Sequence, residues 1–197
     1  MGKLNLLSLD IETSSNDLSG ELISIACVKV EPYEDAAAVL EPDPSHWFYA
    51  QARFEEGLFC KPESMLINGI TFQELNNKKN PTLEELDRKL CYWLGTGKYV
   101  AMGRGIGYFD MMFIERDLPC FFARLSRRVF DLSGWVYGEA ARTGIDAHKL
   151  RENAMGQATD RMPKFFANYG EIKRHHALWD AWHNILFYLY LKNGGLS

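Results

Sequence analysis

Two carboxylates two residues apart, Asp10 and Glu12, stand at the end of an apolar run near the start of the chain. If that run is a β-strand, residues i and i+2 project from the same face, so the two carboxylates leave the strand side by side. Like charges this close repel and raise each other's pKa unless a cation lies between them. The pair is therefore consistent with a metal site, or with two solvated acids at the end of a strand.

A histidine and an aspartate, His175 and Asp180, lie five residues apart near the C-terminus. Five residues turn an α-helix by about 500°, so two helical side chains at this spacing point about 140° apart. We therefore expect His175 on a loop at the entrance of the last helix and Asp180 inside it. A histidine beside an anchored carboxylate suits proton transfer, although a surface or capping histidine is the alternative. His176 competes for this role, but it lies only four residues before Asp180.

A further acid, Asp110, follows a glycine-rich stretch, residues 103–107 (GRGIG), between an expected strand and an expected helix. Glycines permit a tight turn and a close approach of backbone or ligand. We expect Asp110 near a helix N-terminus that faces the end of the sheet; the alternative is an acid favoured there by the helix dipole alone. Asp131, at the end of a later strand, is either an outer partner of the site or a strand-end acid.

The elements that must position these residues are strands first, then strands interleaved with helices. We expect strands over 4–11, 21–30, 47–54, 98–102 and 128–132, and helices or helical turns over 62–68, 71–76, 81–94, 108–115, 134–141 and 175–192. Thr82 with Glu85 three residues later predicts a capping box for the helix of 81–94. Residues 142–163 are polar and fit no clear period. The order predicts an α/β fold, a mixed central sheet flanked by helices, in a single domain over residues 1–197.

Composition and charge limit the class of protein. The chain has 197 residues, 47% of them hydrophobic and 24% charged, as in ordinary globular proteins. A net charge of −4 argues against a protein that coats nucleic acid through a broad basic surface. It does not argue against an enzyme that engages a few nucleotides through cations held by carboxylates.

No run approaches the roughly 18 apolar residues of a membrane helix, and the N-terminal apolar stretch is too short for a signal peptide, so we expect a cytoplasmic protein without membrane association.

The four cysteines, Cys27, Cys60, Cys91 and Cys120, form no CxxC pair and have no histidine at zinc-finger spacing. We therefore expect free thiols in a reducing compartment and no zinc site of that type.

Taken together, the motifs resemble the DEDDh exonucleases, also called DnaQ-like. The resemblance is carried by LSLDIETSS, GYFDMMFI and HHALWDA, the last close to the family's HxALxDA pattern, in the family's order from end to end of the chain. It implies a ribonuclease H-like fold and a 3'→5' exonuclease that releases nucleoside 5'-monophosphates. Residue by residue, it implies that Asp10, Glu12, Asp110 and Asp180 are metal ligands and that His175 is the general base.

Phosphodiester hydrolysis requires an attacking hydroxide, stabilisation of charge on the phosphoryl oxygens and help for the leaving 3'-oxygen. Two divalent cations about 3.5–4 Å apart can supply all three. Hard carboxylate ligands favour Mg²⁺ or Mn²⁺ for these cations. The family also implies that backbone groups around Glu12 and Thr13 bind the terminal sugar and phosphate. Phe109 and the turn of Asn68 and Ile70 are candidates to sandwich the terminal base, although an ordinary core aromatic is the alternative for Phe109.

One position departs from the family pattern. Many members carry Asn four residues before the middle Asp, where this chain has Ile106. Arg104, in the preceding turn, is a candidate to replace the function of that Asn and to contact substrate.

The expected partner is the 3' end of single-stranded nucleic acid. DNA is the favoured substrate, with an exoribonuclease of the oligoribonuclease or RNase T type as the alternative, because no motif reports how a 2'-hydroxyl would be met. A third possibility is a catalytically silent nucleic-acid-binding domain of the same fold. Some members of the family form homodimers, and the sequence leaves the oligomeric state open.

Overall fold

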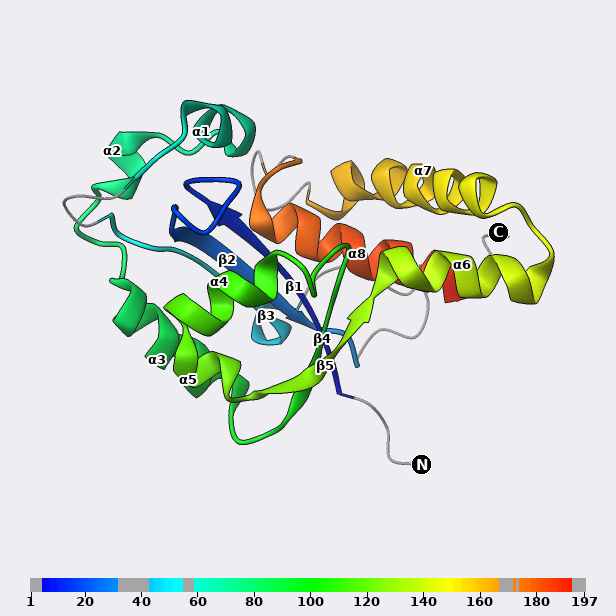
Figure 1. The fold of residues 1–197 in the computed structure, drawn as a ribbon, viewed down its shortest axis with the longest axis horizontal. Coiled ribbons are helices and arrows are strands. Elements are labelled where there is room, and N and C mark those ends of the chain that lie inside the picture. Colours follow the sequence, from blue (N-terminus) through cyan, green and yellow to red (C-terminus); the bar gives the residue numbers. More distant parts are fainter. Residues whose placement is uncertain (1–4, 32–42, 55–58, 167–171, 173, 193–197) are drawn as a thin grey trace.

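A five-stranded mixed sheet forms the centre of the computed structural model, which describes residues 5–31, 43–54, 59–166, 172 and 174–192 (Figure 1). The strands are β1 (Leu6–Thr13), β2 (Leu22–Lys29), β3 (Trp47–Gln51), β4 (Tyr99–Gly103) and β5 (Leu125–Asp131). Their spatial order is β3-β2-β1-β4-β5. β2 is antiparallel to both of its neighbours, whereas β1, β4 and β5 are parallel. The expected mixed α/β sheet is confirmed.

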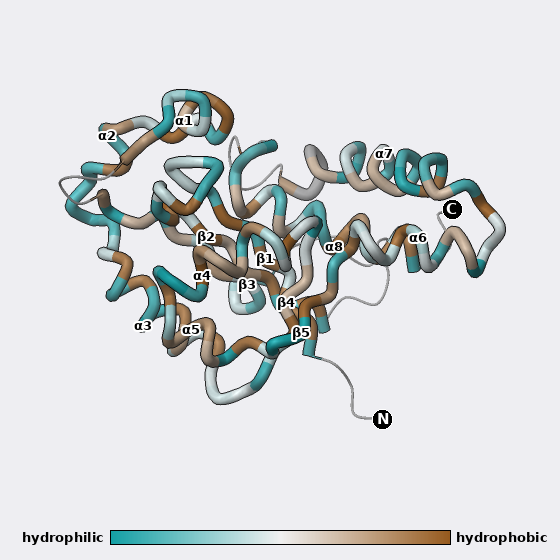
Figure 2. Tube along the Cα trace, in the orientation of Figure 1, coloured by the Kyte–Doolittle hydropathy of each residue, from teal (hydrophilic) through white to brown (hydrophobic). Residues whose placement is uncertain are grey.

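Helices cover both faces of this sheet. The described helices are α1 (Pro62–Asn68), α2 (Phe72–Leu75), α3 (Leu83–Leu94), α4 (Asp110–Asp117), α5 (Pro119–Phe122), α6 (Leu132–Thr143), α7 (Ala147–Phe165) and α8 (Ala177–Lys192), with a short 3-10 turn, η1 (Pro44–His46). One hydrophobic cluster joins the sheet to α3, α4 and α5, and a second joins it to α6, α7 and α8. Figure 2 shows the central strands and α8 mostly in hydrophobic colours, whereas α7 carries long hydrophilic stretches. In the described part of the chain, no helix is both long and apolar enough to cross a bilayer.

The alternation of side chains along β1 decides what reaches each face. Leu7, Leu9 and Ile11 are buried in the cluster with α3, α4 and α5. The residues between them face the opposite side, because successive side chains on a strand alternate. Ser8 is one of these, and its Oγ donates to the carbonyl of Ala181 on α8 at 2.7 Å. Any side chain in phase with Ser8 is therefore directed toward the α8 face.

Most of the expected elements are present, with boundaries shifted by a few residues. The capping box of α3 is confirmed, since Thr82 accepts from the backbone N–H of Glu85 at 3.2 Å and Glu85 accepts from that of Thr82 at 2.9 Å. The stretch 142–163, which fitted no clear period, lies largely in α7. Its buried residues fall on one narrow stripe of every fourth position: Leu150, Ala154, Ala158 and Met162. Two of these four are alanine, so the stripe lacks the bulky apolar pattern that identifies most helices.

The four cysteines are free thiols, as expected. Cys91 and Cys120 are in contact, with their sulfurs 2.7 Å apart, between α3 and α5. Beside them, buried Asp87 accepts from the backbone N–H groups of Cys120 at 2.9 Å and Phe121 at 2.7 Å. Asp87 therefore ties α3 to the first turn of α5.

Replacing Asp87 by Ala leaves both of those N–H groups without their acceptor. We expect Asp87→Ala to lower the free energy of unfolding by about 2–3 kcal/mol, measured by urea denaturation. Glu84→Ala is the matched control on the same helix, because the ion pair of Glu84 with Arg88, at 3.5 Å, joins two exposed side chains. It should change stability by less than about 0.5 kcal/mol. Equal losses in the two variants would contradict the role given to Asp87.

Candidate active site

Three carboxylates meet at the carboxyl end of β1. Asp10, Glu12 and Asp180 each place an oxygen within 4.8 Å of the others. Asp10 and Glu12 are in phase with Ser8, so β1 directs them toward α8, which carries Asp180 in its first turn. The Ser8–Ala181 hydrogen bond holds the same turn of α8 against β1. The packing of α8 on β1 thus brings together residues 170 positions apart in the chain.

Asp110 lies beside this cluster and not within it. It is the first residue of α4, at a helix N-terminus as the sequence predicts. Its charge is near enough to raise the pKa of both Asp10 and Glu12. The structure therefore brings three of the four expected ligands into mutual contact and places the fourth next to them.

The turn before Asp110 is held by Asp131. Gly105 adopts a left-handed conformation (φ 71°) that glycine tolerates at little cost, and its N–H donates to Asp131 Oδ1 at 3.2 Å. The same oxygen accepts from the N–H of Ser133 at 2.8 Å and so caps α6. Asp131 is a helix cap and also an outer support of the site, since its charge raises the pKa of Asp110. The side chain of Ile106 is buried among α3, α4 and α5, on the other face of the sheet from α8.

Burial is the main cause of the shifted pKa values of these carboxyls. It raises the pKa of Glu12 to about 8, with further contributions from the charges of Asp180 and Asp110. Burial also raises the pKa of Asp110 to about 7. The pKa of Asp10 lies well above its usual range, because of burial and then of the three neighbouring carboxylates. At neutral pH the folded protein therefore retains protons on these carboxyls, and a bound cation would displace them.

Arg104, in the glycine-rich turn, forms an ion pair with Asp180 and holds its side chain in place. Its Nη2 forms an ion pair with Asp180 Oδ1 at 3.3 Å, and its Nε donates to Asn184 Oδ1 at 2.8 Å, one turn further along α8. Nη1 contacts the sulfur of Met155 on α7 at 3.3 Å. These three contacts direct the guanidinium at the protein. A supporting role for Arg104 could not be read from the sequence, because its partners come from α7 and α8.

His175 occupies the turn before α8, and Asp180 lies inside the helix, so the expected placement is confirmed. His175 is exposed and is the one non-glycine residue with a positive φ (63°) in the described part of the chain. This conformation costs a non-glycine residue energy, and it directs the backbone N–H of His175 at Asp180 Oδ2, 3.0 Å away. His176 is used differently. Its Nδ1 accepts from the N–H of Leu178 at 3.2 Å, and its ring packs on Tyr49 at 4.5 Å between centroids.

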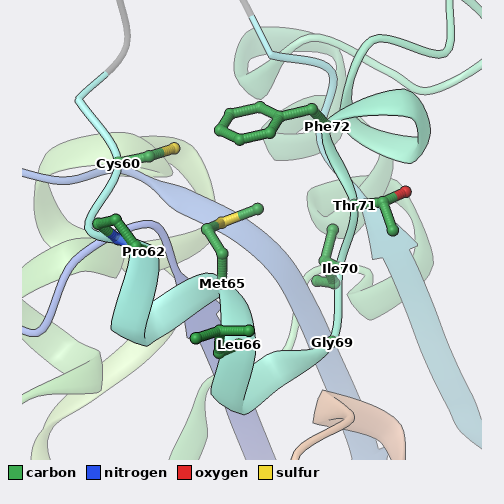
Figure 3. Close-up of a pocket in the computed structure, with 8 residues that line it drawn as sticks. All are labelled: Cys60, Pro62, Met65, Leu66, Gly69, Ile70, Thr71 and Phe72. Atoms are coloured by element: carbon green, nitrogen blue, oxygen red, sulfur yellow. The ribbon is translucent and has the colours of Figure 1, made fainter.

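Three of the expected substrate-binding residues, Thr13, Asn68 and Ile70, lie together at the end of β1. Asn68 Nδ2 donates to the carbonyl of Thr13 at 3.4 Å, and Asn68 Oδ1 accepts from the N–H of Ile70 at 3.0 Å. An apolar pocket of about 470 Å³ opens next to them, and Figure 3 shows Cys60, Met65 and Phe72 turned toward the same space. The pocket is lined by Cys60, Pro62, Met65, Leu66, Gly69, Ile70, Thr71 and Phe72.

The remaining expected contact, Phe109, packs against Phe113 of α4 with ring centroids 5.0 Å apart. It is half-buried and borders the core cluster of α3, α4 and α5. Its aromatic ring therefore has a packing role in addition to any contact with a base.

Solved structures of nucleases have a similar fold at low sequence identity. E. coli exonuclease I, in a zinc-bound complex with single-stranded DNA, matches with a TM-score of 0.64 and 16% identity over 98% of this chain. Cell-death related nuclease 4 (CRN-4) matches with a TM-score of 0.61 and 16% identity over 96% of this chain. Exonuclease I from Methylocaldum szegediense matches with a TM-score of 0.63 and 16% identity over 97%. These similarities confirm the ribonuclease H-like fold.

This chain spans 41% of the length of each of the two exonuclease I proteins and 64% of that of CRN-4. No family model matches the sequence, and no curated protein matches it in sequence.

The raised carboxyl pKa values predict how stability changes with pH. At neutral pH the folded protein retains protons on Glu12 and Asp110 that the unfolded chain has released, so rising pH favours unfolding. Buried His183 has a pKa lowered to about 3 and acts with the opposite sign, but only below its usual value of 6.5. We therefore expect the melting temperature of EDTA-treated protein to fall between about pH 7 and 8.5.

Excess Mg²⁺ or Mn²⁺ should raise the melting temperature more at the upper end of that interval than at the lower, because a bound cation displaces the retained protons. Differential scanning fluorimetry measures both effects. A melting temperature that rises with pH in EDTA, or equal stabilisation by the cation at both ends, would contradict this electrostatic account.

Proposed function

We propose that this chain is a metal-dependent 3'→5' exonuclease that releases nucleoside 5'-monophosphates, with single-stranded DNA as its favoured substrate. The observation that carries the proposal is the half-buried cluster of Asp10, Glu12 and Asp180 at the carboxyl end of β1, with oxygens within 4.8 Å of one another. The fold supports it, because similar structures include exonucleases solved with single-stranded DNA.

The donor set fits hard divalent cations. The cluster offers carboxylate oxygens, which Mg²⁺ and Mn²⁺ prefer, and Asp110 at the start of α4 adds another beside it. We assign Asp10, Glu12, Asp180 and Asp110 as the ligands. When bound, two such cations supply positive charge for the phosphoryl oxygens and make a water more acidic.

His175 is the proposed general base. Its exposed side chain stands on the turn next to Asp180, where it would take the proton from a water, and its backbone N–H fixes the turn to Asp180. The base is thus linked to a ligand of the same site. His176 is the weaker choice, because its Nδ1 accepts a backbone hydrogen bond at the start of α8 and burial lowers its pKa.

The terminal nucleotide is proposed to lie between the cluster and the apolar pocket of α1 and α2. Asn68 joins α1 to Thr13, so the pocket wall formed by Ile70 is fixed relative to the carboxylates. A base in this space would stack on apolar groups, an interaction that tolerates any sequence. Arg104 and Phe109 are the remaining residues proposed to act on the substrate side of the site. Arg104 orients Asp180, and Phe109 supports the start of α4.

Cleavage of end-labelled single-stranded DNA and RNA tests this function. With Mg²⁺ or Mn²⁺ we expect progressive shortening from the 3' end, faster on DNA, and none in EDTA. Asp10→Asn should lower the rate by at least about 10³-fold, since removing one carboxylate breaks the cation site. Internal cuts in a 3'-blocked strand, or full activity in Asp10→Asn, would exclude the proposed reaction, and faster cleavage of RNA would change the substrate.

Two histidine variants test the general base. His175→Ala should lower kcat by about 10²- to 10⁴-fold, the usual contribution of a positioned base. His176→Asn keeps an acceptor for the N–H of Leu178 and should retain activity within about threefold. The reverse pattern in single-turnover kinetics would assign the proton transfer to His176.

A further inference from the structure

Basic side chains gather around one polar pocket between α2 and α3, outside the carboxylate site. The pocket has a volume of about 450 Å³. It is lined by Arg53, Lys78, Lys79, Asn80, Pro81, Glu85, Arg88 and Lys89. Five cations face one carboxylate there, although the whole chain carries a net charge of −4.

Two acids beside this pocket offset part of its charge. Glu85 is turned toward the start of α3, where its carboxylate accepts the N–H of Thr82 at 2.9 Å. Arg88 pairs with Glu84 at 3.5 Å, but both side chains are mostly exposed, and such pairs are weak. Among the described residues, the lining of the pocket therefore still holds more basic side chains than carboxylates, Lys78 and Lys79 among them.

The backbone that carries the two lysines is fixed. Asn80 donates its N–H to the carbonyl of Asn77 at 2.9 Å and its Nδ2 to the carbonyl of Glu74 at 2.9 Å. Lys79 N–H donates to Asn77 Oδ1 at 3.1 Å, and the N–H of Arg53 donates to the carbonyl of Pro81 at 2.6 Å. A ligand would meet a preformed turn, so binding would order only the side chains.

The strand register places this pocket at the same end of the sheet as the carboxylates. Glu12 pairs with Ser24 of β2, and Ser24 pairs with Gln51, the last residue of β3. Gln51 is thus two strand spacings, about 10 Å, from Glu12. Asn80 Nδ2 lies 3.4 Å from Gln51 Oε1, which joins the pocket to this end of β3. A strand held at the carboxylates could reach the pocket within a few nucleotides.

We propose that this cationic pocket binds the phosphate backbone of the nucleic acid strand, upstream of its 3' end. The inference rests on the proposed function, since it assumes that the strand's 3' end lies at the carboxylates. The carboxylate cluster and the neighbouring Asp110 repel a polyanion wherever they are ionised, and cations set back from them supply the attraction that holds the strand. Lysine and arginine contacts to phosphate do not read the base, so the pocket binds any sequence and weakens as salt concentration rises.

Fluorescence anisotropy with 5'-labelled dT12 in EDTA measures this binding without cleavage. For Lys78→Gln/Lys79→Gln we expect the Kd at 0.1 M salt to rise roughly tenfold. The slope of log Kd against log salt should fall by about 1.4, which corresponds to two lost phosphate contacts on a single strand. Arg127→Gln/Arg128→Gln removes the same charge from exposed residues of β5, at the far edge of the sheet, and should leave Kd within about twofold.

Wild-type binding by Lys78→Gln/Lys79→Gln would overturn the proposal, and so would equal losses in the two double variants, because net charge alone would then explain them. The exonuclease proposal fails separately. If no metal supports cleavage but the lysine variant still loses affinity for dT12, the phosphate-binding pocket stands without the reaction. If the chain cleaves DNA and the lysine variant binds normally, the reaction stands without the pocket.

Discussion

Electrostatic repulsion among half-buried carboxylates at the carboxyl end of β1 is the constraint on which the rest of the site depends. Asp10, Glu12 and Asp180 lie within 4.8 Å of one another, and Asp110 is close enough to raise the pKa of two of them. Such a cluster destabilises the folded chain unless a cation or protons neutralise it. The apolar core, the position of α8 and the hydrogen bonds around Asp180 hold these side chains together against that repulsion.

The two faces of the sheet have different roles, one in core packing and the other in carrying the acidic side chains. Leu7, Leu9 and Ile11 anchor β1 in the cluster with α3, α4 and α5, and the alternate residues carry the acids to the α8 side. On that side Asp180 receives an ion pair from Arg104 and a backbone N–H from His175. Both contacts offset part of its charge and fix its orientation before any cation binds. The carboxylate of Asp180 is thus a proposed metal ligand and also the acceptor that fixes the turn carrying the proposed base.

Much of this arrangement could be predicted from the sequence, and the reasons are local. Strand periodicity places Asp10 and Glu12 on one face, and the five-residue spacing requires His175 to precede the helix that contains Asp180. The capping box of Thr82 and Glu85 marks the start of α3 in the same way. What could not be predicted depends on contacts distant in sequence. Arg104 meets α7 and α8, Asp131 holds the turn before Asp110, and α7 has an apolar stripe too narrow to recognise. The cationic pocket could not be predicted, because Arg53 meets the lysines through contacts of the end of β3 and of Pro81 that are distant in sequence.

The central claim is that the carboxylate cluster exists to hold divalent cations. A crystal of the protein soaked with Mn²⁺ and a nucleoside 5'-monophosphate tests this directly through the anomalous scattering of manganese. We expect two peaks about 3.5–4 Å apart at the cluster of Asp10, Glu12 and Asp180, next to Asp110. Absence of peaks at the cluster at saturating Mn²⁺, or manganese bound only elsewhere on the chain, would contradict the central claim.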